Sequence, residues 1–138
     1  MYLLETQIFI DLKKGKKEIV DKIEKIPKDK IYTSSLVVAE ISWALELGGD
    51  KNPTLKDELK QYLEFIIENC NILDFNINSA LKYGELKNIL DKEKIQLEDL
   101  DLMNVSICLS LKLVFVTGNK EKFKKYQKIS NLKVELWN

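Results

Sequence analysis

The sequence predicts an α/β protein, a three-layer α/β/α sandwich around a five-stranded, mostly parallel sheet, built as a single domain over residues 1–138. Short apolar runs alternate with longer segments whose apolar residues recur every three or four positions, as in strands that alternate with amphipathic helices. One run, Leu113-Val114-Phe115-Val116, is apolar throughout, which is typical of a strand covered by helices on both faces. The length of 138 residues is enough for one domain with its own core.

The predicted strands are short, and the segments between them are long enough for helical crossovers. Right-handed crossovers between parallel strands place helices on both faces of the sheet. The five expected strands cover Tyr2-Leu3-Leu4, Ile31-Tyr32-Thr33, Ile72-Leu73, Leu113 to Val116, and Leu132 to Leu136.

Start and stop residues bound six segments of helical periodicity. Thr6 is expected to cap the first helix and Gly15 to end it, and Pro27 ends the second. The other four are expected from Ser35 to Leu47 with Gly48-Gly49 as the stop, from Pro53 to Ile67, from Ile77 to Leu90, and from Leu102 to Leu109. Trp43 and the apolar side of residues 55–67 are expected to pack in the core, with a protein interface as the alternative.

The composition excludes several kinds of active site. The chain has no histidine, and all 22 of its basic residues are lysine. A Ser-His-Asp triad, a Cys-His pair and a histidine-ligated zinc are therefore impossible, as is a bidentate arginine clamp on a phosphate. Cys70 and Cys108 are isolated and read as reduced core thiols of a cytoplasmic protein. No apolar run approaches ~20 residues, so neither a membrane span nor a signal peptide is expected.

The charges cancel over the whole chain but not locally. The 22 acidic and 22 basic residues sum to zero. Residues 11–30 carry eight lysines against five acids, and residues 112–128 carry six against one, whereas residues 85–101 hold six acids against three lysines. Solvated helix faces are the ordinary reading of such runs. The alternative is an acidic pocket with basic flanks, which suits a polyanion bound through metal ions.

Polar side chains follow several predicted strands at the edge where ligands bind in open α/β sheets. Glu5 follows the first strand, Glu40 lies in the helix after the second, and Asn119 follows the fourth. Asp101 lies near the start of the helix that leads into the fourth strand, although the helix dipole alone also favours acids there. The supporting polar side chains nearby are Thr6, Gln7, Ser34, Asp99 and Thr117.

A cluster of carboxylates repels itself unless it is protonated or neutralised, and hard divalent cations are the usual neutralisers. A ligand set made only of oxygen favours Mg²⁺ or Mn²⁺ over zinc. Such a site suits metal-assisted hydrolysis of phosphodiester bonds. A receiver-like phosphoacceptor is a lesser alternative, because it needs two adjacent acids after the first strand and only Glu5 is there.

Six segments, in order and over nearly the whole chain, resemble PIN-domain proteins of the VapC toxin type. The opening MYLLETQIFIDL resembles that family's usual MYLLDTNIFIDL, and the ending LKVELW resembles LKVENW. The intervening matches are VAEI at 38–41, YGEL at 83–86, LEDLDLMNV at 97–105 and VFVTGNKEKF at 114–123.

The resemblance implies an α/β/α sandwich and an Mg²⁺- or Mn²⁺-dependent ribonuclease, expected in the cytoplasm as a homodimer that an antitoxin holds inactive. By motif, the family's catalytic positions fall on Glu5, Glu40, Asp101 and Asn119, and its metal ligands on the first three. Thr6 matches the family's hydroxyl position. Lysines suggested for contacts with RNA phosphates are Lys13, Lys14, Lys120 and Lys122.

Three positions depart from the family pattern. Glu5 stands where the family has Asp, Gln7 where it has Asn, and Lys122 where it has the aspartate of the DF segment. The two longer side chains either compensate for each other around a displaced metal ion or mark a site that has lost its chemistry, with Lys122 supplying part of the cation's charge. The alternative function is therefore a catalytically inactive PIN-like domain that binds RNA or protein.

Overall fold

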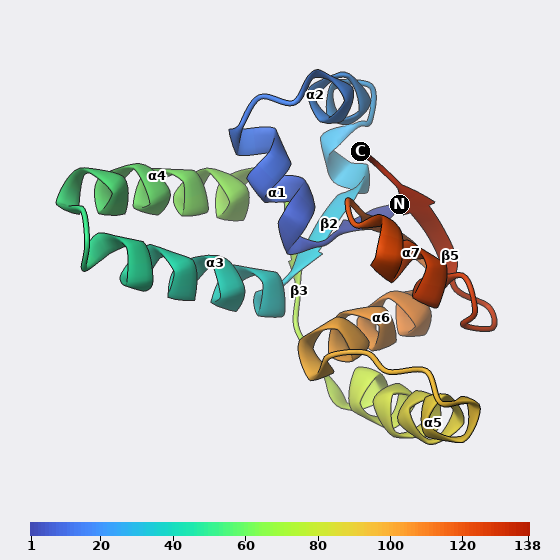
Figure 1. Ribbon diagram of the computed structural model, residues 1–138. Helices are drawn as coiled ribbons and strands as arrows, with labels where there is room; N and C mark the ends of the chain where they lie inside the picture. Colours follow the sequence, from blue (N-terminus) through green and yellow to red (C-terminus); the bar gives the residue numbers. More distant parts are fainter.

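Five parallel strands form the central sheet of the computed structural model, which describes residues 1–138 (Figure 1). Every strand pairing is parallel, so the predicted α/β sandwich is confirmed. The order across the sheet is β3-β2-β1-β4-β5. The strands are β1 (Tyr2–Leu4), β2 (Ile31–Ser34), β3 (Asn71–Leu73), β4 (Val114–Thr117) and β5 (Lys133–Leu136).

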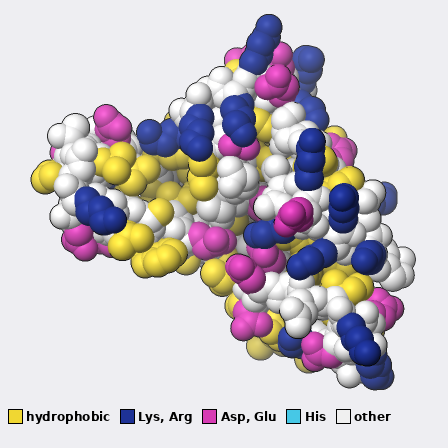
Figure 2. All heavy atoms as spheres, viewed as in Figure 1, with side chains coloured by type: hydrophobic (Ala, Val, Ile, Leu, Met, Phe, Trp, Pro, Cys, Tyr) yellow, Lys and Arg dark blue, Asp and Glu magenta, His cyan; other side chains and the backbone are white.

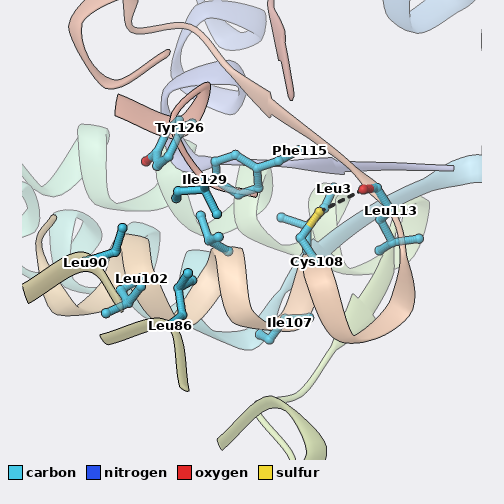
Figure 3. Packing of buried hydrophobic residues seen from close by; sticks show 11 residues of the cluster. Leu3, Leu86, Leu90, Leu102, Ile107, Cys108, Leu113, Phe115, Tyr126 and Ile129 are labelled. Carbon is cyan, nitrogen blue, oxygen red and sulfur yellow. Dashed lines mark hydrogen bonds between the residues drawn. The ribbon is translucent and has the colours of Figure 1, made fainter. Parts of the chain in front are cut away.

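Adjacent residues of the central strand point to opposite faces of the sheet, so Leu3 and Leu4 belong to separate cores. On one face, Leu3 and Phe115 pack against three helices, with the Cys108 thiol donating to the Leu113 carbonyl at 3.1 Å (Figure 3). These helices are α5 (Ile77–Glu93), α6 (Asp99–Leu111) and α7 (Lys120–Tyr126). On the other face, Leu4 and Val116 pack against four helices. They are α1 (Thr6–Lys13), α2 (Lys17–Glu24), α3 (Ser35–Gly49) and α4 (Pro53–Asn69).

Two short elements were not expected from the sequence. The helix α7 has few apolar residues, so its periodicity is weak, and its start is marked instead by the Asn119 side chain, which accepts from the backbone N–H groups of Glu121 and Lys122. A single 3-10 turn covers Lys28–Lys30. The predicted stop at Gly48-Gly49 was early, because both glycines lie in the last turn of α3.

The α3–α4 hairpin projects from the body of the molecule (Figure 1) and carries apolar side chains on its surface (Figure 2). The expectation that Trp43 packs in the core was wrong, since the side chain is 69% exposed. In α4, Ile66 is buried, but Phe65 and Ile67 are exposed. Trp43 lies in the half of the hairpin farther from the sheet, where no third element covers α3, whereas Phe65 and Ile67 lie at the end of α4 nearer β3. No helix has both the length and the apolar composition needed to cross a bilayer.

Both cysteines are free, and neither is suited to act as a nucleophile. Burial raises the pKa of the Cys70 thiol to about 11 and that of Cys108 to about 12. Both thiols are therefore protonated at neutral pH.

The hydroxyl of Tyr126 is a buried group without a partner in the protein. The ring packs edge-on against Phe115, with 4.9 Å between the ring centroids, but the oxygen makes no hydrogen bond. We expect Tyr126→Phe to keep the packing and to raise the free energy of unfolding by about 1 kcal/mol, because an unsatisfied buried hydroxyl costs about 1–3 kcal/mol. Urea denaturation of the two proteins measures this, and a loss of stability in the variant would show that the hydroxyl is bonded in solution.

Candidate active site

A pocket of about 180 Å³ opens at the carboxyl edge of the sheet, next to the central strand β1. The chain extends the sheet in one direction from β1 to β2 and in the other from β1 to β4, so this is the switch point where open α/β sheets bind ligands. Acidic side chains gather with lysines in the middle of the face where α3, α6 and α7 converge (Figure 2). The lining residues are Glu5, Thr6, Gln7, Ile10, Glu40, Asp101, Asn104, Asn119 and Lys122. A larger hollow, of about 640 Å³, lies against α5 and α6, and no predicted site residue lines it.

Glu5 directly continues β1 and is held at the floor of the pocket. Its backbone N–H donates to the Val116 carbonyl at 3.2 Å, which extends the pairing of β1 with β4 by one bond. Its carboxylate accepts from the Thr117 hydroxyl and from the Gly118 N–H at 3.2 Å. Burial raises the pKa of Glu5, and the Thr117 hydrogen bond and the charge of Lys122 only partly oppose this. The ionised carboxylate is thus short of positive charge in its surroundings.

Glu40 reaches the pocket from the second turn of α3. The Thr6 hydroxyl, at the start of α1, donates to its carboxylate at 3.0 Å. Burial raises the pKa of Glu40, and the negative charge of Asp101 adds to the effect. For both Glu5 and Glu40, therefore, the surrounding protein does not fully offset the negative charge of the ionised side chain.

Asp101, in the first turn of α6, is the one pocket carboxylate that is paired with a cationic side chain. The ammonium of Lys122, on α7, lies 2.9 Å from one carboxylate oxygen and 3.2 Å from the other. Burial lowers the pKa of Lys122, but the hydrogen bond and charge of Asp101, together with the charge of Glu5, outweigh burial and raise it. Lys122 is therefore charged, and it is the one cationic side chain that lines the pocket.

Gln7 is turned toward Asp11 rather than toward the carboxylates. Its carboxamide donates to buried Asp11 at 3.0 Å, and Lys16 pairs with the same carboxylate at 2.9 Å. Gly118 makes room for this side chain, because a Cβ there would lie 3.1 Å from the Gln7 Cγ and 3.3 Å from an Asp11 oxygen. The longer side chain at position 7 and the glycine at 118 fit together.

Of the other predicted residues, some are close to the pocket and some are not. Thr117 contributes through Glu5. Asn119 lines the pocket while its carboxamide oxygen caps α7. Asp99 is exposed and accepts from the Tyr83 hydroxyl at 3.0 Å, outside the pocket. Of the lysines predicted to contact RNA, Lys13, Lys14 and Lys120 are exposed and do not line the pocket.

Asn104 and Ile10 line the pocket but were not predicted from the sequence. Asn104 accepts from the Ser34 hydroxyl at the end of β2. The signal that identifies Asn104 is its spacing, since a residue three positions after Asp101 lies on the same face of a helix.

The donor set fits a hard divalent cation in its chemistry. Carboxylates from three elements line one pocket, every polar ligand atom is oxygen or nitrogen, and two of the carboxylates lack compensating charge. In the present side-chain arrangement no three acidic or cysteine side chains converge as a ready ligand set. Hydroxyl, backbone N–H and ammonium donors of the chain itself occupy the carboxylates instead.

Fold and site together define a class, a small α/β/α domain with an acidic pocket at the carboxyl edge of a parallel sheet. Within that class the chain belongs to the PIN domain family, whose model matches residues 2–129. Ribonucleases of this family depend in general on divalent metal ions.

Similar proteins match over almost the full length. The chain is 27% identical to Ribonuclease VapC1 of Haemophilus influenzae strain R2866, over 99% of this chain and 98% of that protein. Two solved structures are similar in fold and sequence. One is VapBC2 from Rickettsia felis bound to a promoter DNA fragment, with a TM-score of 0.85, 26% identity, and coverage of 99% of this chain and 98% of that chain. The other is VapBC-1 from nontypeable Haemophilus influenzae, with a TM-score of 0.80, 27% identity, and coverage of 99% and 97%.

Because the charge of Glu5 is buried, its removal is expected to raise the thermal stability of the protein by an amount that depends on pH. Because burial raises its pKa above the unfolded value, the folded protein binds more protons than the unfolded chain above about pH 4.5, and stability falls as the pH rises through this window. We expect Glu5→Gln, whose carbonyl still accepts from Thr117, to raise the melting temperature more at pH 7 than at pH 4. Thermal melts in chelator-treated buffer measure the two differences. An equal or smaller gain at pH 7 would contradict the assignment.

The contact between Gln7 and position 118 predicts a coupled pair of substitutions. Gly118→Ala is expected to destabilise the protein by about 1 kcal/mol, because the added methyl overpacks the Gln7 stem. In a Gln7→Ala background, which removes the Cγ, the same substitution is expected to cost less. A double-mutant cycle by urea denaturation gives the coupling. Additive effects would mean that Asp11 or the backbone, rather than Gln7, sets the need for glycine.

Proposed function

We propose that the chain is a toxin of the toxin–antitoxin type, an endoribonuclease that hydrolyses RNA phosphodiester bonds with Mg²⁺ or Mn²⁺. The observation that carries this proposal is that Glu5, Glu40 and Asp101, from three separate elements, line one pocket at the switch point of the sheet. Full-length similarity to proteins named ribonucleases, and to complexes named VapBC, supports the same function.

In this proposal Glu5, Glu40 and Asp101 would hold the metal ion. A divalent ion held there would lower the pKa of a water molecule and offset the charge that develops on the phosphate oxygens. Asn119 orients the attacking water or the substrate at the end of β4. Thr6 and Thr117 position Glu40 and Glu5 through the hydrogen bonds already described. Gln7 acts indirectly, since it donates a hydrogen bond to the buried Asp11 one turn later in α1.

Lysines provide the only cationic contacts to the RNA, because the chain has no arginine. Lys122 lies in the pocket, and Lys120 and the exposed lysines at the end of α1, Lys13 and Lys14, lie outside it. A lysine binds phosphate as a point charge and without the geometric selectivity of a guanidinium. We therefore propose that base-independent electrostatic attraction brings RNA to the pocket, with strong dependence on salt.

The partner is proposed to be an antitoxin protein that covers the site, as expected for a toxin of this type. The cytoplasm, where RNA is available, is the proposed location. Homodimer formation, expected from the family resemblance, stays a prediction that light scattering of the purified chain tests.

Cleavage of a mixed RNA pool tests the proposed activity. With Mn²⁺ present we expect Asp101→Asn to lower the initial rate at least about 100-fold, since even residues that merely orient metal ligands contribute about 10–100-fold. Asp99→Asn is the matched control, because Asp99 lies two residues earlier on the same helix but outside the pocket. It should cleave like the wild type.

Two results would contradict the proposal. Equal cleavage by wild type and Asp101→Asn, or cleavage that continues in excess chelator, would remove the carboxylate–metal mechanism. A wild-type protein that binds RNA but does not cleave it with either ion would favour the inactive PIN-like domain instead.

A further inference from the structure

We propose that Lys122 is an internal cation of the pocket, which competes with the divalent metal ion for Asp101 and must leave that carboxylate when the metal ion binds. The inference rests on the proposed function, because it takes the pocket carboxylates as the metal ligands. It assigns to Lys122 a positioning and regulatory role that an RNA-contacting surface lysine does not have.

The backbone of Lys122 is fixed at the pocket by two anchors on α7. Its N–H donates to the capping oxygen of Asn119 at 3.0 Å, and one turn later Tyr126 is fully buried against Phe115. The start of α7 therefore cannot drift away from the carboxyl edge of the sheet. The lysine stem begins beside the pocket in every state in which α7 is folded.

The contact with Asp101 differs from most ion pairs of this protein. Four of the six pairs join two side chains that are each at least 40% exposed, and such pairs contribute little. The Asp101 side chain is only 12% exposed, and both of its oxygens lie within 3.2 Å of the Lys122 ammonium. A buried carboxylate that lost this cation without a replacement would be strongly destabilised.

One ammonium cannot remain there when a dication binds the same carboxylate. Mg²⁺ binds carboxylate oxygen at about 2.0–2.1 Å, so an ion on Asp101 would lie within a few ångströms of an ammonium held at 2.9 Å. Two cations that close repel each other, and more strongly beside a carboxylate that is only 12% exposed than in bulk water. Metal binding is therefore an exchange, in which the dication replaces the ammonium.

The length of the lysine side chain gives the displaced ammonium somewhere to go. Four flexible methylenes allow it to swing from the carboxylate to the solvent side of the pocket, and the side chain is already 35% exposed. In that position it adds a positive charge where an RNA phosphate would approach. Lys122 thus offsets the charge of Asp101 before the metal ion binds and becomes available to the substrate afterwards.

Calorimetric titration of chelator-treated protein with MnCl₂ tests the competition. Lys122→Met keeps the apolar stem and removes the charge, and Lys124→Met, on the exposed side of the same helix, is the matched control. We expect Lys122→Met to bind Mn²⁺ at least about tenfold more tightly than wild type, as the loss of a charge-assisted hydrogen bond to the competing cation implies. Lys124→Met should bind like wild type. Equal or weaker binding by Lys122→Met would overturn the inference.

A second measurement uses only the wild-type protein, so it does not depend on the folding of a variant. Acetylation by an amine-specific reagent, followed residue by residue by mass spectrometry, should modify Lys122 several-fold faster with Mg²⁺ than with chelator, while Lys124 does not change. An unchanged rate at Lys122 would overturn the inference.

These outcomes separate the inference from the proposed function. Suppose that wild type binds Mn²⁺ and cleaves RNA, and that Asp101→Asn weakens Mn²⁺ binding. If Lys122→Met then binds Mn²⁺ with the wild-type affinity, the competition is wrong but the proposed function stands. If neither wild type nor Lys122→Met binds Mn²⁺, both the competition and the metal-dependent function are wrong.

Discussion

Burial of carboxylate charge in the acidic pocket is the constraint on which the rest of the site depends, and the negative charge of Asp101 adds to it. Glu5, Glu40 and Asp101 reach the same small volume from β1, α3 and α6. Each is given a different donor, namely a hydroxyl with a backbone N–H, a second hydroxyl, and an ammonium. Hydroxyls and amides orient a carboxylate but carry no net charge, so Glu5 and Glu40 stay under-compensated. In the proposed function, a divalent cation would offset this uncompensated charge.

The sheet topology explains why these groups meet. Because all five strands are parallel, their carboxyl ends lie along one edge, and the order β3-β2-β1-β4-β5 places the ends of β1, β2 and β4 side by side. Both cores lock the central strand, with Leu3 buried on one face and Leu4 on the other. The residue that follows them, Glu5, is therefore positioned by the most buried part of the molecule. Rigidity of this kind is what a pre-organised site requires.

The parts of this site that depend on periodicity and strand order could be predicted from the sequence. An apolar run followed by an acid places Glu5 at a strand end, and a parallel sheet brings Glu40 and Asp101 to the same edge. What could not be predicted are the partners of flexible or longer side chains. The orientation of the Gln7 side chain depends on the absence of a Cβ at Gly118, more than a hundred residues away. The pairing of Lys122 with Asp101 depends on α7, a helix whose apolar residues are too few to give a clear periodicity. Exposure of Trp43 depends on how far a hairpin projects, which no local pattern encodes.

We propose that Glu5, Glu40 and Asp101 form a single divalent-cation site. The most direct measurement is the anomalous scattering of Mn²⁺ in crystals of the isolated chain grown with the ion. We expect one strong peak, coordinated by oxygens of Glu5, Glu40 and Asp101, with the Lys122 ammonium turned away from Asp101. A pocket without a peak at saturating Mn²⁺, with Lys122 still bound to Asp101, would contradict this proposal.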